Sequence, residues 1–329
     1  MFFSTSFLFR EEKFKSTVLK IALGIIIFLL AFQPVGAWAG DFHIFLVSLF
    51  PESYFSSFFQ LHFERLLGEK TVRFFEFSAF CSALSDGNVP WEANSRPIVV
   101  FSELSLEHGK KVEKLIAEKG ESLRPLILGV NCQGNFGNND FLSLLVDYHR
   151  GGREIGKTIK GRGGKVLLAH WGEFFVDQFQ SGLREEIGDF KVVFWQNEAL
   201  SSDFLEDFEY LIITSDFLTQ EIIKILRDTS LSEKNLIVLE ASTRMLAYLQ
   251  EGKINFLLDT KPSRLAGKLV NWIEKLEKGE EILEREIFIP PLIITPSNLE
   301  EADSYEVLVR CFLCGRGTRL SGARPFNRQ

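Results

Sequence analysis

Aromatic and acidic side chains gather at positions 170–177, directly after a short apolar run at 165–169. A helix-like segment with paired glycines and a glycine turn precede this run, and a second helix opens near Gln178. This is the strand–helix alternation of a parallel sheet. Ligands of such sheets bind beyond the carboxyl ends of the strands. Trp171 could therefore stack on a ligand, although a lid or interface aromatic would look the same in the sequence. We expect the binding chemistry at this loop.

The sequence shows no arrangement of residues that is typical of a catalyst. No serine or cysteine is placed with a base, and the five histidines show no HExxH pairing. Gly161, Gly163 and Gly164 precede a strand rather than follow one, so they do not form a phosphate loop. Cys311 and Cys314 have CxxC spacing, but no βαβ pattern surrounds them. We therefore expect a protein that is not an enzyme and uses neither a cofactor nor a metal.

Alternating strand and helix patterns predict an α/β fold with parallel sheets. The expected strands lie at 42–49, 71–77, 97–101, 126–130, 142–146, 165–169, 191–195, 210–214, 236–240, 254–258, 286–289 and 292–295. The expected helices lie at 54–67, 106–119, from 178, 201–207, 219–227, 243–251 and 265–278. Residues 81–96 are expected as a loop. Residues 131–140, rich in Gly and Asn, suit a connection that leaves one domain.

Length and charge narrow the class of protein further. The chain has 329 residues and a formal net charge of −7, which fits two domains of usual size. Nucleic acid is not expected as a partner, because no basic stripe is present. The four cysteines do not have the spacing of a disulfide framework, which leaves isolated bridges open.

The first 39 residues have the pattern of a secretory signal peptide. Lysines precede an apolar run at 21–32, and a small-x-small site follows at 37–39. The alternative is an uncleaved membrane anchor, although the run is shorter than the roughly 20 residues of a spanning helix. We expect a mature chain that begins at Gly40 and is exported to the periplasm.

Several sequence pieces follow one another in an order and spacing that one known family shares. They are Asp147-Tyr148 with Gly151, Gly152 and Gly156, then GKVLLAHWG, QSGLREEI, LIITSDFLTQEII, YLQEGKINFLLDTKPSRLAGKLV and IFIPPLIITPSN. The chain resembles a type 1 periplasmic binding protein of the sugar-binding kind, a fold shared with the effector domains of LacI-type repressors. The resemblance is best over 147–298 and weaker over 40–146. A signal peptide precedes the domain and no helix-turn-helix does, which favours the exported binding protein over a repressor.

The resemblance implies two Rossmann-like α/β lobes that close on a ligand through a hinge of several crossing strands. Carried over to this chain, one lobe comprises 40–146 and 260–285. The other comprises 147–259 and 286–297. Residues 298–329 would form a tail outside the core.

The resemblance also implies ligand-binding positions in the first lobe. Tyr54 and Phe55 match paired aromatics after the first strand, and core packing at a helix start is the alternative. Asn131 matches an acidic ligand-binding position, with a turn-forming role as the alternative. An amide both donates and accepts, so hydroxyl binding would survive the loss of charge.

In the second lobe the matching positions depart from the family pattern. Phe179 stands where the family often has an arginine, so a guanidinium fork is lost. Ser215 replaces an asparagine, while Asp216 matches the aspartate that follows it. Glu240 stands where an aspartate usually accepts hydroxyls, and Thr260 stands at a common glutamine position. These departures imply a ligand that differs from the usual pentose or hexose.

Three functions are consistent with these residues. The first is an exported solute-binding protein that closes on a sugar-like small molecule and hands it to an inner-membrane ABC permease, or presents it to a membrane sensor. The second is a degenerate binding domain kept for protein contact. The third, an exported enzyme, lacks a nucleophile–base pair or a metal set in the sequence.

Overall fold

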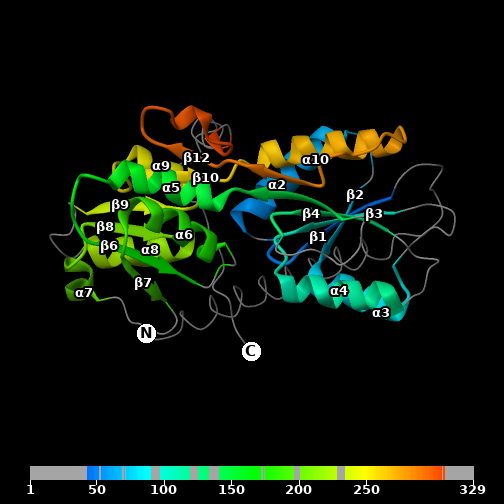
Figure 1. Cartoon of the computed structure of the whole chain (residues 1–329), viewed down its shortest axis with the longest axis horizontal. Helices are drawn as coiled ribbons and strands as arrows, with labels where there is room; N and C mark the ends of the chain where they lie inside the picture. Colours follow the sequence, from blue (N-terminus) through cyan, green and yellow to red (C-terminus); the bar gives the residue numbers. More distant parts are fainter. Residues whose placement is uncertain are drawn as a thin grey trace, which may run out of the picture. The chain divides into compact units, whose positions relative to one another are not determined.

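The computed structural model describes residues 43–51, 53–68, 70, 72–89, 97–118, 125–132, 141–171, 173, 175–195, 201–227, 234–305 and 307. Within these residues the chain forms two six-stranded sheets flanked by helices (Figure 1). This confirms the α/β class with parallel sheets. We call each sheet with its helices a lobe. The predicted signal peptide lies outside the described residues.

The first sheet has the strand order β11-β5-β4-β3-β1-β2, and all of its pairs are parallel. Its strands are β1 (Ile44–Ser48), β2 (Val72–Glu76), β3 (Ile98–Ser102), β4 (Leu126–Val130), β5 (Leu142–Val146) and β11 (Glu286–Ile289). Its helices are α2 (Tyr54–Leu67), α3 (Phe77–Asp86), α4 (Leu106–Glu118) and α10 (Pro262–Glu277). Alternate residues of β1 enter different cores, Ile44 on the face with α2 and α10 and Phe45 on the face with α3 and α4. Burial on both faces explains the continuous apolar runs of β1, β3 and β4.

The second sheet has the strand order β12-β10-β9-β8-β6-β7, and only β12 runs antiparallel among these strands. Its strands are β6 (Val166–His170), β7 (Lys191–Phe194), β8 (Tyr210–Ile213), β9 (Asn235–Val238), β10 (Phe256–Asp259) and β12 (Leu292–Ile294). Its helices are α5 (Tyr148–Ile159), α6 (Val176–Ile187), α7 (Ser202–Glu206), α8 (Asp216–Arg227) and α9 (Thr243–Gln250). Residues of α5 and α6 pack on one face of the sheet, and residues of α8 and α9 pack on the other.

The chain passes between the two sheets three times, after β5, after β10 and after β11. The resemblance implied that 286–297 belongs to the second lobe. This is wrong for 286–289, because these residues form β11, which pairs with β5 in the first sheet. Only β12 adds to the second sheet, through β10. The expectation that 131–140 leaves a domain is also wrong, because β4 and β5 are neighbours in one sheet. Residues 133–140 themselves lie outside the described residues.

Two further expectations need correction. Residues 81–86 are not a loop, because α3 runs to Asp86 and buries Phe77, Phe80, Cys81 and Leu84 on one face. The tail does not begin at position 298, because Ala302 and Ser304 are buried and Ser304 donates a hydrogen bond to the Ala241 carbonyl. The burial of these two residues places the start of the predicted tail within the second lobe.

Helices α5 and α6 approach each other closely at two glycines. A Cβ atom at Gly152 would lie 2.1 Å from the Phe179 carbonyl oxygen, and one at Gly182 would lie 1.9 Å from the His149 carbonyl oxygen. The family-like glycines of these segments therefore have a packing role. Among the described helices, none is long and apolar enough to cross a membrane.

Candidate functional site between the two lobes

Residues after strands of both sheets act on one another electrostatically. We call the following five residues the inter-lobe site: Tyr54, Glu103, Tyr148, Glu173 and Glu240. Tyr54 and Glu103 follow β1 and β3, whereas Glu173 and Glu240 follow β6 and β9, and Tyr148 begins α5 after the first crossing. The charge of Glu240 raises the pKa of both tyrosines. The charges of Glu103 and Glu173 raise the pKa of Glu240. The carboxyl ends of both sheets therefore face one region, as expected for a ligand site in an α/β fold.

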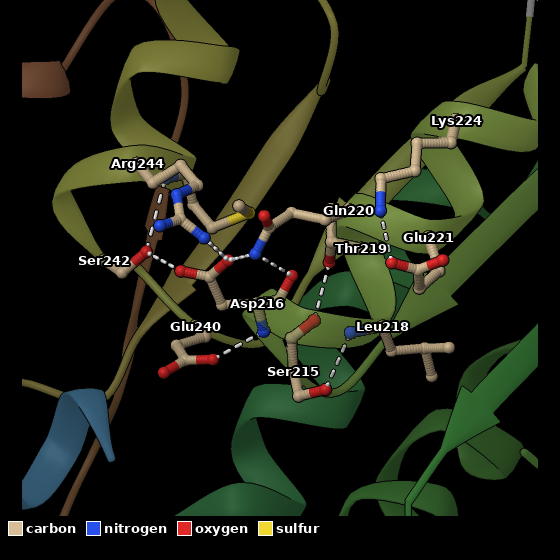
Figure 2. Close-up of polar contacts among 11 residues, drawn as sticks. Ser215, Asp216, Leu218, Thr219, Gln220, Glu221, Lys224, Glu240, Ser242 and Arg244 are labelled. Carbon is tan, nitrogen blue, oxygen red and sulfur yellow. Dashed lines mark hydrogen bonds and ion pairs between the residues drawn. The ribbon is translucent and has the colours of Figure 1, made fainter. Parts of the chain in front are cut away.

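Glu240 lies at the centre of this region. Its Oε2 accepts a hydrogen bond of 2.7 Å from the backbone N–H of Asp216, and its second oxygen points away from α8 (Figure 2). Burial raises the pKa of Glu240 to about 8, the charge of Asp216 adds to this rise, and the bond from the Asp216 N–H opposes it. At neutral pH the Glu240 carboxyl is therefore mostly protonated and can both donate and accept.

Asp216, by contrast, is engaged by its own lobe. Its carboxylate accepts hydrogen bonds from Ser242 Oγ at 2.8 Å and Gln220 Nε2 at 2.8 Å. Arg244 Nη1 lies 3.4 Å from the same carboxylate (Figure 2). Ser215 Oγ accepts an N–H from the first turn of α8. Asp216 and Ser215 therefore hold the start of α8, beside the residue that faces the site.

Glu103 is a site residue that the sequence analysis missed. It has a left-handed backbone, with φ of 58°, and its side chain is nearly buried. Its Oε2 accepts hydrogen bonds from Ser53 Oγ at 2.5 Å and Ser56 Oγ at 2.8 Å. The available signal was its position directly after the buried strand 98–102, the same strand-end rule that selects Glu240.

Tyr148 is a buried aromatic residue of the inter-lobe site. Its ring stacks on that of Phe175, with centroids 4.2 Å apart and an interplanar angle of 10°. Asn131 Nδ2 donates a 3.2 Å hydrogen bond to the Tyr148 hydroxyl. Burial and the nearby carboxylates raise the pKa of Tyr148, and the Asn131 bond opposes this. Asn131 has φ of 53°, so it has the predicted turn conformation and also orients a site aromatic.

Tyr54 connects the two lobes. Its hydroxyl donates a 3.2 Å hydrogen bond to Asp259 Oδ1 at the end of β10. Burial, then the charges of Asp259 and Asp303, raise its pKa. Thr260 follows Asp259 and is 4% exposed. Its Oγ1 has no hydrogen-bond partner among the described residues. A buried hydroxyl left without a partner is costly, and a ligand group would satisfy it.

A buried ion cluster lies behind Tyr54, where the chain leaves β10. Lys261 Nζ lies 3.3 Å from Asp259 and 3.5 Å from Asp303, with the lysine and aspartate side chains 5%, 0% and 8% exposed. The ammonium also donates to the Glu301 carbonyl. The backbone N–H of Asp303 donates to Asp259 Oδ2 at 2.8 Å. The residues beyond 298 thus stabilise the chain where it crosses from the second lobe to the first after β10.

After β6, Glu173 connects Trp171 to Thr214 at the end of β8. Its carboxylate accepts Thr214 Oγ1 at 2.6 Å and the Trp171 backbone N–H at 2.9 Å. The Trp171 ring is half-buried and meets Phe217 edge to face, with centroids 5.7 Å apart. Phe217 is 55% exposed. The loop therefore adds a carboxylate to the inter-lobe site and an accessible aromatic beside it.

Besides Tyr54, which is also buried, two sequence-predicted site residues lie in the hydrophobic core. Phe55 stacks on Phe59 inside the first lobe, and Phe179 is fully buried in the hydrophobic core. The resemblance implied an arginine at this position that reaches a ligand, whereas the Phe179 side chain is enclosed in the core.

A cavity lies at the opposite edge of the second sheet. It has a volume of about 490 Å³ and is lined by residues at the amino ends of β6, β7 and β8, among them Gly161, Lys165, Phe190 and Lys191. It is distinct from the strand ends that hold Glu240.

Comparison with known proteins supports the fold but assigns the chain to no sequence family. No family model matches the chain, and no curated protein sequence matches it. Solved structures do match. A myo-inositol binding protein from Caulobacter, bound to myo-inositol, is 16% identical with a TM-score of 0.65, covering 82% of this chain and 99% of its own. GanP, a glucose-galactose binding protein from Geobacillus stearothermophilus, is 11% identical with a TM-score of 0.63, covering 79% and 99%.

A third similar structure is a carbohydrate transporter solute binding protein from Agrobacterium radiobacter in complex with D-arabinose. It is 17% identical with a TM-score of 0.63, covering 82% of this chain and 100% of its own. Identities this low carry information on the fold alone. With the strand orders of the two sheets and their three crossings, they show that the chain has the fold of the type 1 periplasmic binding proteins.

Proposed function

We propose that the chain is an exported solute-binding protein that closes its two lobes on a small polar molecule. The observation that carries the proposal is the convergence of carboxylates and aromatics from both sheets around Glu240. Polar groups that converge beside flat apolar faces are suited to bind hydroxylated ligands. The similar structures support the same ligand class. They are a myo-inositol binding protein, a glucose-galactose binding protein and a carbohydrate transporter solute binding protein in complex with D-arabinose.

The remaining parts of the proposal follow from this function. The predicted signal peptide would deliver the chain to the periplasm. There it would pass its ligand to an inner-membrane ABC permease, or present it to a membrane sensor. Closure requires only that the ligand bind the closed arrangement better than the open one.

Thermal unfolding of the full chain against sugars, inositols, polyols and nucleosides tests the proposal. A ligand at about 100 times its Kd stabilises the folded state by about 2.7 kcal/mol, so the midpoint should rise with concentration. Glu240→Ala should abolish the rise, because it removes an acceptor and donor at the centre of the site. Lys224→Ala, on the exposed face of α8, should leave it unchanged. A folded protein that responds to no compound, or a response that survives Glu240→Ala, would contradict the proposal.

A further inference from the structure

Helix α2 belongs to the first lobe, yet it has a second apolar face that packs on the other lobe. Phe55, Phe59 and Phe63 lie in the core that α2 shares with its own sheet. Tyr54 is buried in the core of the second lobe instead, and Phe58, one helical turn later, packs against the same core. In the described part of the chain, every other buried member of that core lies at position 167 or beyond. Separation of the lobes would therefore expose aromatic surface of α2 to water, which costs free energy.

The hydroxyl of Tyr54 adds a polar contact to this apolar one. It donates a 3.2 Å hydrogen bond to Asp259 Oδ1. Burial, followed by the neighbouring charges, raises the pKa of Tyr54, so the hydroxyl keeps its proton at neutral pH. Both side chains are buried, so water does not compete for the bond.

Asp259 is fixed as an acceptor by residues around it. The backbone N–H of Lys261 donates to Oδ1 at 2.9 Å, and that of Asp303 donates to Oδ2 at 2.8 Å. The Lys261 ammonium lies 3.3 Å from Oδ2. The carboxylate would therefore stay in place if Tyr54 moved away, and Oδ1 would lose a donor.

The connections of the chain do not impose the contact between Tyr54 and Asp259. The three crossings between the lobes follow β5, β10 and β11, and α2 borders none of them. Asp259, by contrast, is the last residue of β10, at the second crossing. A rotation of one lobe against the other about the crossings would move Tyr54 away from Asp259, because α2 packs on the core of the first lobe.

We propose that Tyr54 is a latch that holds the two lobes together before a ligand arrives and so limits access to the inter-lobe site. The inference rests on the proposed function and specifies the regulation of the same site. The Tyr54 ring in the core of the second lobe and its hydroxyl bond to Asp259 both favour the closed arrangement. A closed arrangement that is already populated raises ligand affinity, whereas ligand entry requires the latch to release.

Small-angle X-ray scattering of the full chain without added ligand tests the latch. Tyr54→Phe keeps the ring and removes the donor to Asp259, which should raise the ratio of open to closed molecules about tenfold, or about 1.4 kcal/mol. Tyr54→Ala also removes the ring from the core of the second lobe and should raise the ratio further. The radius of gyration should therefore increase from the parent to Tyr54→Phe, and again to Tyr54→Ala.

Tyr210→Phe is the matched control. Tyr210 is 5% exposed, against 7% for Tyr54, and it lines the cavity at the amino ends of the second sheet, away from the inter-lobe site. Its replacement should leave the radius of gyration unchanged. Circular dichroism and urea unfolding should show which variants are folded, and Tyr54→Phe decides alone if Tyr54→Ala is not. Folded Tyr54 variants with the radius of the parent, or an equal increase in Tyr210→Phe, would overturn the latch.

Failure of the latch and failure of the proposed function give different results. If no compound raises the unfolding midpoint, the solute-binding function fails, and the scattering of the ligand-free variants still decides the latch. If a compound binds the parent and the Tyr54 variants scatter as the parent does, the latch fails and the function stands.

Discussion

Replacing Lys261 by methionine should lower the free energy of unfolding by about 3–5 kcal/mol. Methionine keeps much of the apolar stem and removes the ammonium. Asp259 and Asp303 would then remain buried without the cation that lies 3.3 and 3.5 Å from them. Burial already raises the pKa of Asp259, which shows that its ionised form is costly even with the lysine present.

Urea unfolding followed by circular dichroism measures this loss as a lower midpoint. The matched control is Lys224→Met, whose ammonium pairs with Glu221 on the surface at 65% exposure. Such exposed pairs contribute about 0.5 kcal/mol or less. Equal losses in the two variants would show that the Lys261 cluster does not fasten the crossing after β10.

Gly182→Ala should also be strongly destabilising, by about 3 kcal/mol or more. The added methyl group would lie 1.9 Å from the His149 carbonyl oxygen and 3.1 Å from the Arg153 backbone nitrogen. Both are backbone atoms, so α5 and α6 would have to separate. That separation would also disturb Phe179, whose carbonyl oxygen lies beside Gly152 of α5 and whose side chain is fully buried.

Gly267→Ala is the matched control, because Gly267 lies inside α10 and a Cβ there meets nothing within 4 Å. Alanine is the better helix former, so this variant should gain up to about 1 kcal/mol. Thermal unfolding of both variants should therefore give midpoints that move in opposite directions. A Gly182→Ala protein as stable as the parent would show that α5 and α6 do not pack at this glycine.

Much of the fold could be predicted because local pattern and burial agree. The helix expected at 54–67 is found at Tyr54–Leu67, where buried aromatics recur at helical spacing. Strands such as β3 and β4 are fully buried apolar runs and lie within a residue of their expected bounds. The order of the elements then favours two parallel sheets, because consecutive parallel strands require crossovers.

Pairing between distant segments could not be predicted in the same way. The run 286–289 is a short strand in either sheet, and only its pairing with β5 places it in the first. The acidic stretch after 298 looks solvent-exposed by composition. Asp303 is nevertheless buried, because Lys261 and the backbone N–H of Ser263 hold its carboxylate.

Candidate site residues that directly follow buried strands could be predicted from the sequence, whereas the others could not. Glu240 and Asn131 follow buried strands, and both lie at or beside the inter-lobe site. Phe179 was predicted as a site residue only because it matches a ligand-binding position of the family, yet its apolar side chain is in the core. Nothing in the sequence distinguishes Asp216, bound by Arg244 in its own lobe, from a carboxylate that faces a ligand.

Hydrogen exchange with and without the compound that most raises the unfolding midpoint tests most directly whether a ligand binds between the lobes. We predict slower exchange at the strand ends of both lobes, including the segments around Ser56, Asn131 and Asp216, whose N–H groups lie beside the inter-lobe site. The edge near Gly161, with its separate cavity, should be unaffected. Protection confined to that edge, or to one lobe, would contradict binding between the lobes.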